Sequence, residues 1–209
     1  MSDWKSGKQF ADMLGGISLP NVFNPYSDVC KIHDLADAPA IRRANLAAIL
    51  DAAMGQGAAE LWVGLELGAR GGRRTGLALT DEATLQSCGD YWGISGLQRA
   101  TSGALVKEQT AKYVWRALPA AKDRVFLWNA FPLHCHQPDS LTNRGHTRAE
   151  VDKVSTILPW LVEVLGAEKV VSLGRGAELA ARRTGLRSSY VRHPSRGGGP
   201  EFLRTIHKV

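Results

Sequence analysis

Four short apolar runs recur along the chain, and each is bounded by polar residues or glycine. Runs of this length with such boundaries are typical of strands that are buried on both faces of a sheet. The pattern predicts strands over residues 60–64, 125–129, 169–173 and 188–192. The second run ends on the polar residue Asn129, which places an amide at the carboxyl end of its strand.

Between these runs, apolar residues recur at helical spacing. An Ala/Leu-rich stripe stops at Gly55-Gln56-Gly57, and Thr147 with Glu150 three residues later forms a capping-box signature. The spacing predicts helices over 40–54, 106–118, 147–165, 176–184 and 200–207. Strands that alternate with helices predict an α/β fold, a three-layer α/β/α sandwich around a mostly parallel four-stranded sheet.

Two segments lack this periodicity. Residues 1–35 are rich in Gly, Pro, Asn and Ser, and we interpret them as an irregular N-terminal arm. Residues 68–103 are dominated by Gly, Arg, Thr and Ser, and this stretch is too long for an ordinary connection, so we interpret it as functional surface. With 209 residues, the chain is expected to form a single domain over 1–209.

Composition and charge narrow the class of protein. The chain has 44% hydrophobic and 22% charged residues, which is typical of a globular protein. Its net charge of +6 favours a polyanionic partner such as nucleic acid. Three widely spaced cysteines indicate a reducing compartment. No apolar segment suits a signal peptide or a membrane span, so we expect a soluble, cytoplasmic protein associated with the nucleoid.

Several motifs for metals and nucleotides are absent from the sequence. Gly174-Arg175-Gly176 resembles part of a dinucleotide fingerprint, but Leu179 stands where the third glycine belongs, and there is no P-loop. His134-Cys135-His136 has no partner at ligand spacing, and no C-x-x-C occurs. We therefore expect no metal and no cofactor.

Polar residues follow each predicted strand, where ligands bind in parallel sheets. Glu66 follows the first strand, Asn129 ends the second, Gly174-Arg175-Gly176 follows the third and His193-Pro194-Ser195 follows the fourth. We expect these four loops to converge on one cleft. A carboxylate, an amide and an imidazole are suited to holding a planar heterocycle, stabilising charge and orienting water.

This arrangement resembles the uracil-DNA glycosylase superfamily. Its members carry a first motif of the type G-[QEIM]-[DAN]-P-[YG], an Asn at the end of the second strand and a His-Pro-Ser motif after the last. Gly64 to Gly68, Asn129 and His193 to Ser195 are similar to these three. Further similarity lies in Thr75–Glu82, Asn143-Arg144 and Val170–Gly176, so that the resemblance covers about Phe23 to His207.

The chain departs from the family pattern at three positions. Glu66 stands where relatives carry Asp, Asn or Ala, Leu67 replaces the usual Pro, and Leu79 falls where many relatives place a base-stacking Phe. Stacking on the base is then expected either to be weaker or to come from another aromatic residue, the candidates being Tyr26, Tyr91, Trp92 and Phe131. The iron-sulfur members of the family need four cysteines, and this chain has three.

The resemblance implies a monofunctional DNA glycosylase that flips uracil out of DNA and hydrolyses its N-glycosidic bond. It implies that Glu66 orients water and offsets the cationic sugar, while His193 donates a hydrogen bond to uracil O2. The implied base-binding residues are Asn129, Leu79, Gly64, Gly68 and Phe131. The implied DNA-binding residues are Arg70, Arg73, Arg74, Ser195, Arg196 and Gly197.

Two other functions remain open at this point. One is a glycosylase for hypoxanthine, xanthine or mismatched thymine, because the first motif is altered. The other is a non-catalytic binder of abasic or single-stranded DNA that keeps the scaffold. The expected partner is DNA that contains uracil or an abasic site, and the expected state is a monomer.

Overall fold

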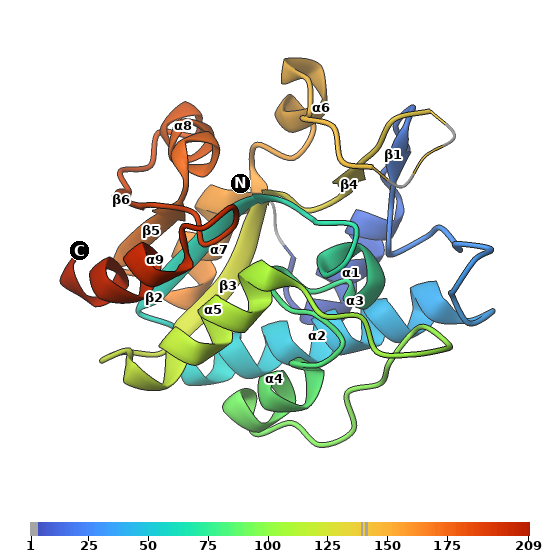
Figure 1. The fold of residues 1–209 in the computed structure, drawn as a ribbon, viewed down its shortest axis with the longest axis horizontal. Helices are drawn as coiled ribbons and strands as arrows, with labels where there is room; N and C mark the ends of the chain where they lie inside the picture. The colour runs from blue at the N-terminus through green and yellow to red at the C-terminus, as the bar shows by residue number, and fades with distance from the viewer. Residues whose placement is uncertain (1–3, 139, 141) are drawn as a thin grey trace.

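A parallel sheet of four strands forms the centre of the computed structural model, which describes residues 4–138, 140 and 142–209 (Figure 1). The strand order is β3-β2-β5-β6. These strands span Val125–Phe131, Glu60–Glu66, Lys169–Leu173 and Ser189–Val191 in that order. All three pairings are parallel, and the register places Gly64 opposite Asn129. All four predicted strands are therefore confirmed, with boundaries shifted by up to two residues.

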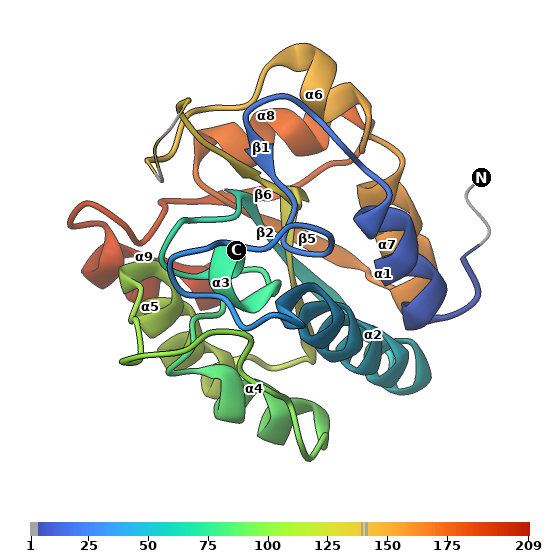
Figure 2. The ribbon, with the colours of Figure 1, turned by 90° about the vertical axis from the view of Figure 1, so that its right-hand side faces the viewer.

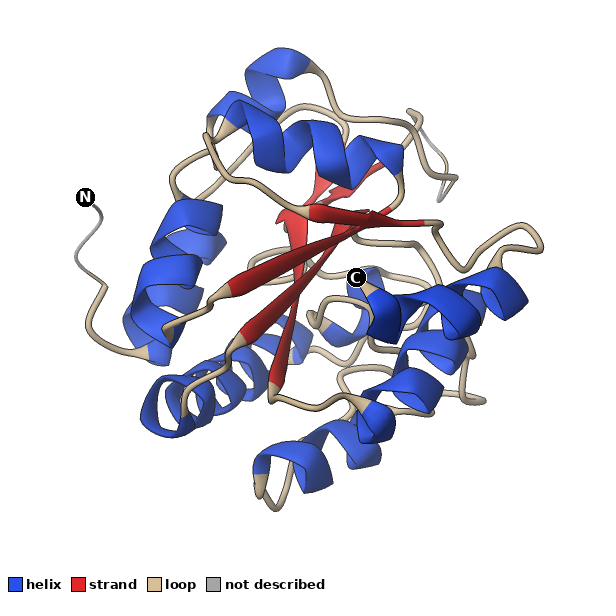
Figure 3. Ribbon diagram, turned by 90° about the vertical axis from the view of Figure 1, so that its left-hand side faces the viewer, coloured by secondary structure: helices blue, strands red, loops and turns tan. Residues whose placement is uncertain are grey.

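Helices cover both faces of this sheet (Figure 3). Side chains alternate along a strand, so Leu61 and Val63 of β2 pack into one apolar cluster and Trp62 into the other. The first cluster holds residues of α1 (Gly7–Gly15), α2 (Ala38–Gln56), α4 (Leu85–Trp92), α7 (Ile157–Leu165) and α8 (Arg175–Arg183). The second holds residues of α5 (Gln109–Ala117) and α9 (Gly199–Thr205). The predicted three-layer α/β/α sandwich is thus confirmed.

The remaining elements are short. They are β1 (Val22–Phe23), which pairs antiparallel with β4 (His134–Cys135), and α3 (Gly72–Thr75), α6 (Arg148–Asp152), η1 (Leu118–Ala120) and η2 (Ile206–Lys208). Among the described residues, no helix is both long enough and apolar enough to cross a membrane.

The predicted helix over 147–165 begins as expected but divides into α6 and α7. Thr147 Oγ1 accepts a hydrogen bond from the backbone of Glu150, whose carboxylate accepts one from Thr147 N–H, which confirms the capping box. A continuous helix would require an N–H on Pro159 to donate to the carbonyl of Ser155, and proline has none. Restarting the helix at Ile157 places Pro159 in the first turn, where no donor is needed.

The N-terminal segment is not the irregular arm that its composition predicts. Helix α1 begins after Ser6, whose hydroxyl accepts a hydrogen bond from Gln9 N–H, and it buries Phe10 and Leu14 completely. It lies beside α7 (Figure 2). Phe10 stacks on Trp160 of α7, with 5.0 Å between ring centroids. Glycine and serine at the ends of a two-turn helix conceal its apolar spacing. Residues 1–3 of the predicted arm lie outside the described residues.

Half of the segment that we interpreted as functional surface, 18 of residues 68–103, is also buried. Every residue from 71 to 82 is buried, and the segment contains α3 and the connection to α4. Its polar groups have internal partners: Thr75 Oγ1 donates to the carbonyl of Thr80, and Glu82 accepts from Val106 N–H. Buried polar groups cost little when they are hydrogen-bonded, so polar composition does not identify surface here.

Helix α2 carries a completely buried arginine, Arg42, and its removal is expected to destabilise the fold strongly. Its guanidinium lies 2.6 Å from Asp34 and donates to the carbonyls of Arg74 and Pro25. Arg42→Ala leaves Asp34 buried without its cation, so the free energy of unfolding should fall by about 3–5 kcal/mol. Urea denaturation measures this. The exposed Arg116→Ala is the control, and a loss from Arg42→Ala as small as that of the control would contradict the assignment.

Candidate active site

A cavity of about 320 Å³ opens at the carboxyl ends of the central strands. The segment 64–68 after β2, Asn129 on β3 and the segment 193–196 after β6 all contribute to its wall. Its lining residues are Leu65, Glu66, Leu67, Gly68, Gly72, Leu79, Glu108, Thr110, Asn129, Asn143, His193, Ser195 and Arg196. Three of the four predicted loops therefore meet here. The fourth, after β5, supports the site, because a Cβ on Gly174 would lie 3.1 Å from His193 Cβ.

Asn129 presents an unused acceptor. Its Nδ2 donates to the main-chain carbonyl of Glu66 at 3.0 Å, which fixes the amide orientation, because a carbonyl can only accept. Its Oδ1 is buried and has no hydrogen-bond partner among the described residues. Gly64 makes this packing possible, since a Cβ there would lie 2.6 Å from Asn129 Nδ2 and 3.0 Å from Leu79 Cδ2. A ligand N–H is the natural partner for the free oxygen.

Glu66 is held by a residue far away in the sequence. Its Oε1 accepts the backbone N–H of His146 at 2.7 Å and lies 2.5 Å from His146 Nδ1. The side chain is only 13% exposed. Phe131 packs behind the imidazole with 5.6 Å between ring centroids. The carboxylate is therefore fixed at the edge of the cavity.

The loop that carries His146 is itself anchored. Arg144 forms a two-pronged ion pair with Glu150, at 2.6 and 3.0 Å. This guanidinium lowers the pKa of Glu150 to about 2. Asn143, in the same loop, accepts a hydrogen bond from Ala69 N–H at 3.3 Å and lines the cavity. The ion pair thus connects the 143–146 loop to the first turn of α6, and the Asn143 hydrogen bond connects the same loop to the segment after β2.

His193 is oriented by Ser195. Ser195 N–H lies 3.2 Å from His193 Nδ1, and Ser195 Oγ lies 2.8 Å from the same atom. Because an amide N–H can only donate, Nδ1 is an acceptor, and the proton of the neutral ring is on Nε2. Burial lowers the pKa of His193 and so favours the neutral form. The cavity therefore has a neutral imidazole N–H donor in its wall.

Basic residues lie at the mouth of the cavity. Arg196 is exposed, lines the cavity and has a φ of 49°, in the left-handed region that a non-glycine residue rarely adopts. Gly197 follows it with a φ of 81° and is also exposed. Arg70 is exposed beside the opposite loop and donates to the carbonyl of Lys107. A positive φ at a non-glycine residue such as Arg196 is a strained backbone conformation, and such conformations often occur at functional sites.

Two arginines expected at this surface lie inside the protein instead. The guanidinium of Arg73 stacks on the ring of Phe23, 3.7 Å from its centroid. Arg74 lies 3.0 Å from Glu82 Oε1, and its side chain is 8% exposed. Neither can reach a DNA backbone from these positions, so the predicted DNA-binding role is corrected for both. Their burial is possible because neighbouring segments supply an aromatic ring and a carboxylate.

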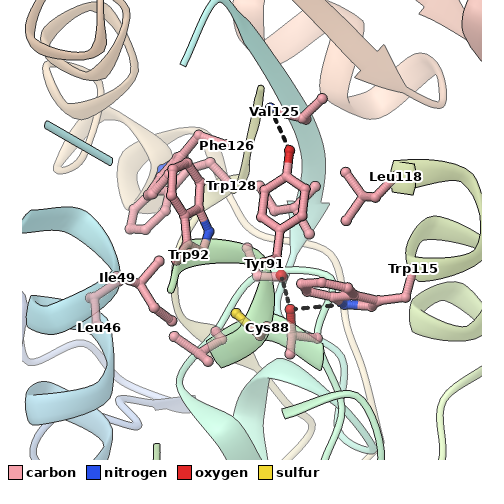
Figure 4. A pocket seen from close by; sticks show the side chains of 14 residues that line it. Leu46, Ile49, Cys88, Tyr91, Trp92, Trp115, Leu118, Val125, Phe126 and Trp128 are labelled. Atoms are coloured by element: carbon pink, nitrogen blue, oxygen red, sulfur yellow. Dashed lines mark hydrogen bonds between the residues drawn. The ribbon is translucent and has the colours of Figure 1, made fainter. Parts of the chain in front are cut away.

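None of the four aromatic stacking candidates lines the cavity. Tyr26 is 1% exposed and its hydroxyl donates to the carbonyl of Gly76, and Phe131 is completely buried behind His146. Tyr91 and Trp92 point into a separate apolar pocket beside β3 (Figure 4). The expectation of an aromatic base-stacking group among them is therefore wrong, as is the base-binding role of Phe131. The apolar side chains that line the cavity are those of Leu65, Leu67 and Leu79, and Leu79 has a φ of 54°.

Several site residues escaped sequence reasoning. Glu108 and Thr110 line the cavity from the start of α5, and His146 holds Glu66. His134 is buried, donates from Nδ1 to the carbonyl of Leu67 at 2.8 Å, and has its pKa lowered by burial to about 4. Of these four residues, only His134 was considered from the sequence, as a possible metal ligand. In the described ranges, no three His, Cys, Asp or Glu side chains gather closely enough to hold a metal ion.

Comparisons with known proteins bear on the fold. No protein-family model matches the sequence, and no curated protein matches it. Among solved structures, the chain is similar to the crystal structure of wild-type Pedobacter heparinus SMUG2, with a TM-score of 0.57 and 14% sequence identity. The alignment covers 97% of this chain and 90% of that one. At this identity the similarity establishes a shared fold over nearly the whole length.

Proposed function

We propose that this protein is a monofunctional DNA glycosylase that removes uracil from DNA. One observation carries the proposal: Glu66, Asn129 and His193, from three different strand ends, line one cavity large enough for a nucleobase. The fold neighbour SMUG2 is a uracil-DNA glycosylase-family member, which supports the same class of activity. The enzyme extrudes the damaged nucleotide into the cavity, because the glycosidic bond is inaccessible inside a base stack.

Asn129 recognises the base in this proposal. Its free Oδ1 accepts the N3–H of uracil, which gives the buried oxygen the partner that it lacks. Cytosine carries a lone pair at N3 and leaves the oxygen unpaired, so it binds more weakly. Leu79 supplies apolar contact to the base in place of an aromatic ring, and Gly64 and Gly68 keep the adjoining wall free of side chains.

His193 stabilises the departing base. Cleavage of the glycosidic bond leaves negative charge on the base, and the His193 Nε2–H donates to uracil O2 as that charge develops. The Ser195 N–H holds Nδ1 as an acceptor, so the ring does not need to reorient during the reaction. The donor is therefore preorganised.

Glu66 acts on the sugar side. Its carboxylate offsets the positive charge that develops on the deoxyribose and orients a water molecule for attack on C1′. The water oxygen bonds to C1′ and its proton passes to the carboxylate, while the bonding electrons leave with the base. His146 keeps the carboxylate in place through its backbone N–H.

Four residues at the mouth hold the DNA backbone. Arg70 and Arg196 supply positive charge, Ser195 supplies a hydroxyl and Gly197 allows close approach of the main chain. The chain acts as a monomer and as one domain over residues 1–209. Phosphate contacts of this kind make affinity fall as salt concentration rises.

The proposal is tested with purified, metal-free protein and labelled oligonucleotides that contain one uracil, hypoxanthine, xanthine, mismatched thymine or abasic site. Alkali cleavage reports base release and a parallel gel shift reports binding. Scission at uracil supports the proposal. Scission only at another base shifts the assignment to that lesion, while binding to the abasic oligonucleotide without any scission means that the protein is a lesion-binding module.

A further inference from the structure

Glu108 is a second carboxyl group in the wall of the same cavity, and the mechanism above does not use it. It immediately precedes helix α5, and its backbone N–H donates to Asp81 Oδ2 at 2.6 Å. Its two carboxyl oxygens lie over Gly68 and Gly71, where a Cβ on either glycine would overlap them. The glycines therefore provide the space that this side chain occupies.

The carboxyl group of Glu108 has no internal hydrogen-bond partner. Among residues 4–138, 140 and 142–209, no group donates to or accepts from either oxygen. Burial, and after it the negative charge of Asp81, raise the pKa of Glu108 to about 7, with Arg70 acting in the opposite direction. Glu66, His193 and Arg196 are the other ionisable groups that line the cavity. Glu66 differs from Glu108 in being held by His146.

We propose that Glu108 is a further base-binding residue, whose neutral carboxyl group donates a hydrogen bond to a carbonyl oxygen of the extruded base. This inference rests on the proposed glycosylase function. Together, Asn129 Oδ1 and the Glu108 O–H offer an acceptor and a donor to one ligand. Bases with a lactam N–H and C=O match that pair, and uracil, hypoxanthine and xanthine are among them.

Ionisation of Glu108 opposes the reaction for two reasons. The carboxylate loses the O–H that donates to the base, and it places a negative charge beside a leaving group that is itself becoming negative. Base release should therefore slow as the pH rises through about 7.

The test compares single-turnover rates of the full-length wild type and its variants on uracil-containing DNA between about pH 5.5 and 9. The wild-type rate should fall about tenfold or more between pH 7 and pH 9. Glu108→Gln keeps a neutral donor, so its rate should stay nearly level over this range and lie within about threefold of wild type at the acidic end. Glu108→Ala has neither the donor nor the charge, so it should be slower than wild type at the acidic end and its rate should not fall as the pH rises through about 7.

A second variant moves the carboxyl group without deleting it. In Gly68→Ala, the new Cβ overlaps Glu108 Oε1, which is the far end of a flexible side chain and is able to swing away. Its rate and pH profile should resemble those of Glu108→Ala, with little change in melting temperature. Glu163→Gln, at an exposed position of α7, controls for the loss of a carboxylate and should match wild type.

The outcomes separate this inference from the function on which it rests. An active wild type with a Glu108→Gln profile that falls in parallel overturns the role of Glu108 alone. If Glu108→Gln and Glu108→Ala lower only the melting temperature and leave the pH profile of the rate unchanged, that result overturns the base-binding role and assigns Glu108 to packing against the 68–71 loop. A wild type that releases no base from any DNA overturns both the proposed function and this inference.

Discussion

Replacing His193 by alanine should lower the single-turnover rate of base release by about 10²–10³-fold. The substitution removes the preorganised Nε2–H donor at the position where negative charge develops, and a water molecule there has to reorient during the reaction. Affinity for uracil-containing DNA should change little, because the phosphate contacts remain. Quenched-flow or manual single-turnover kinetics and fluorescence anisotropy measure the two quantities separately.

His207→Ala is the matched control, because His207 is exposed in η2 and does not line the cavity. The pH dependence of the wild-type rate gives a second test of the role of His193. Because burial lowers the pKa of His193, its ring stays neutral below the ordinary histidine value of 6.5, so acidification to that value should not slow the wild type. A His193→Ala variant with the wild-type rate would remove the imidazole from the mechanism.

Glu66→Gln should lower the rate by about 10²–10⁴-fold while leaving DNA affinity nearly intact. Glutamine keeps the shape of the side chain and an oxygen for the His146 N–H, but it loses the negative charge and the ability to take a proton from water. The same kinetic and anisotropy assays apply, with Glu163→Gln as the control. Weaker DNA binding at unchanged turnover would contradict the role given to Glu66.

The sheet could be predicted from the sequence because its strands are buried on both faces. Such strands are short, mainly apolar runs, and residues 60–64, 125–129 and 169–173 have this pattern. The capping box at Thr147 was equally clear, since its two hydrogen bonds are local. Knowledge that ligands bind at the carboxyl ends of parallel strands then placed Glu66, Asn129 and His193 together without any contact information.

The site residues that the sequence analysis misplaced or missed depend on contacts between segments that are distant in the sequence. Their charge predicts surface positions for Arg73 and Arg74. In the fold, however, Arg73 stacks on Phe23 and Arg74 pairs with Glu82, and both side chains are buried. His146 lies 80 positions after Glu66, and Glu108 reaches the cavity only because Gly68 and Gly71 leave room. Periodicity and motif spacing carry no information about such pairs. The family resemblance suggests a stacking aromatic without indicating which residue supplies it, and the fold places all four candidates away from the cavity.

The most direct test of the glycosylase proposal is mass spectrometry of a uracil-containing oligonucleotide after incubation with the full-length protein. The proposal predicts free uracil and an intact strand whose mass has fallen by that of the base and risen by one water. The matched thymine oligonucleotide should remain unchanged. An unaltered uracil strand under saturating protein, with Glu66, Asn129 and His193 all present, would contradict the assignment of this cavity to base excision.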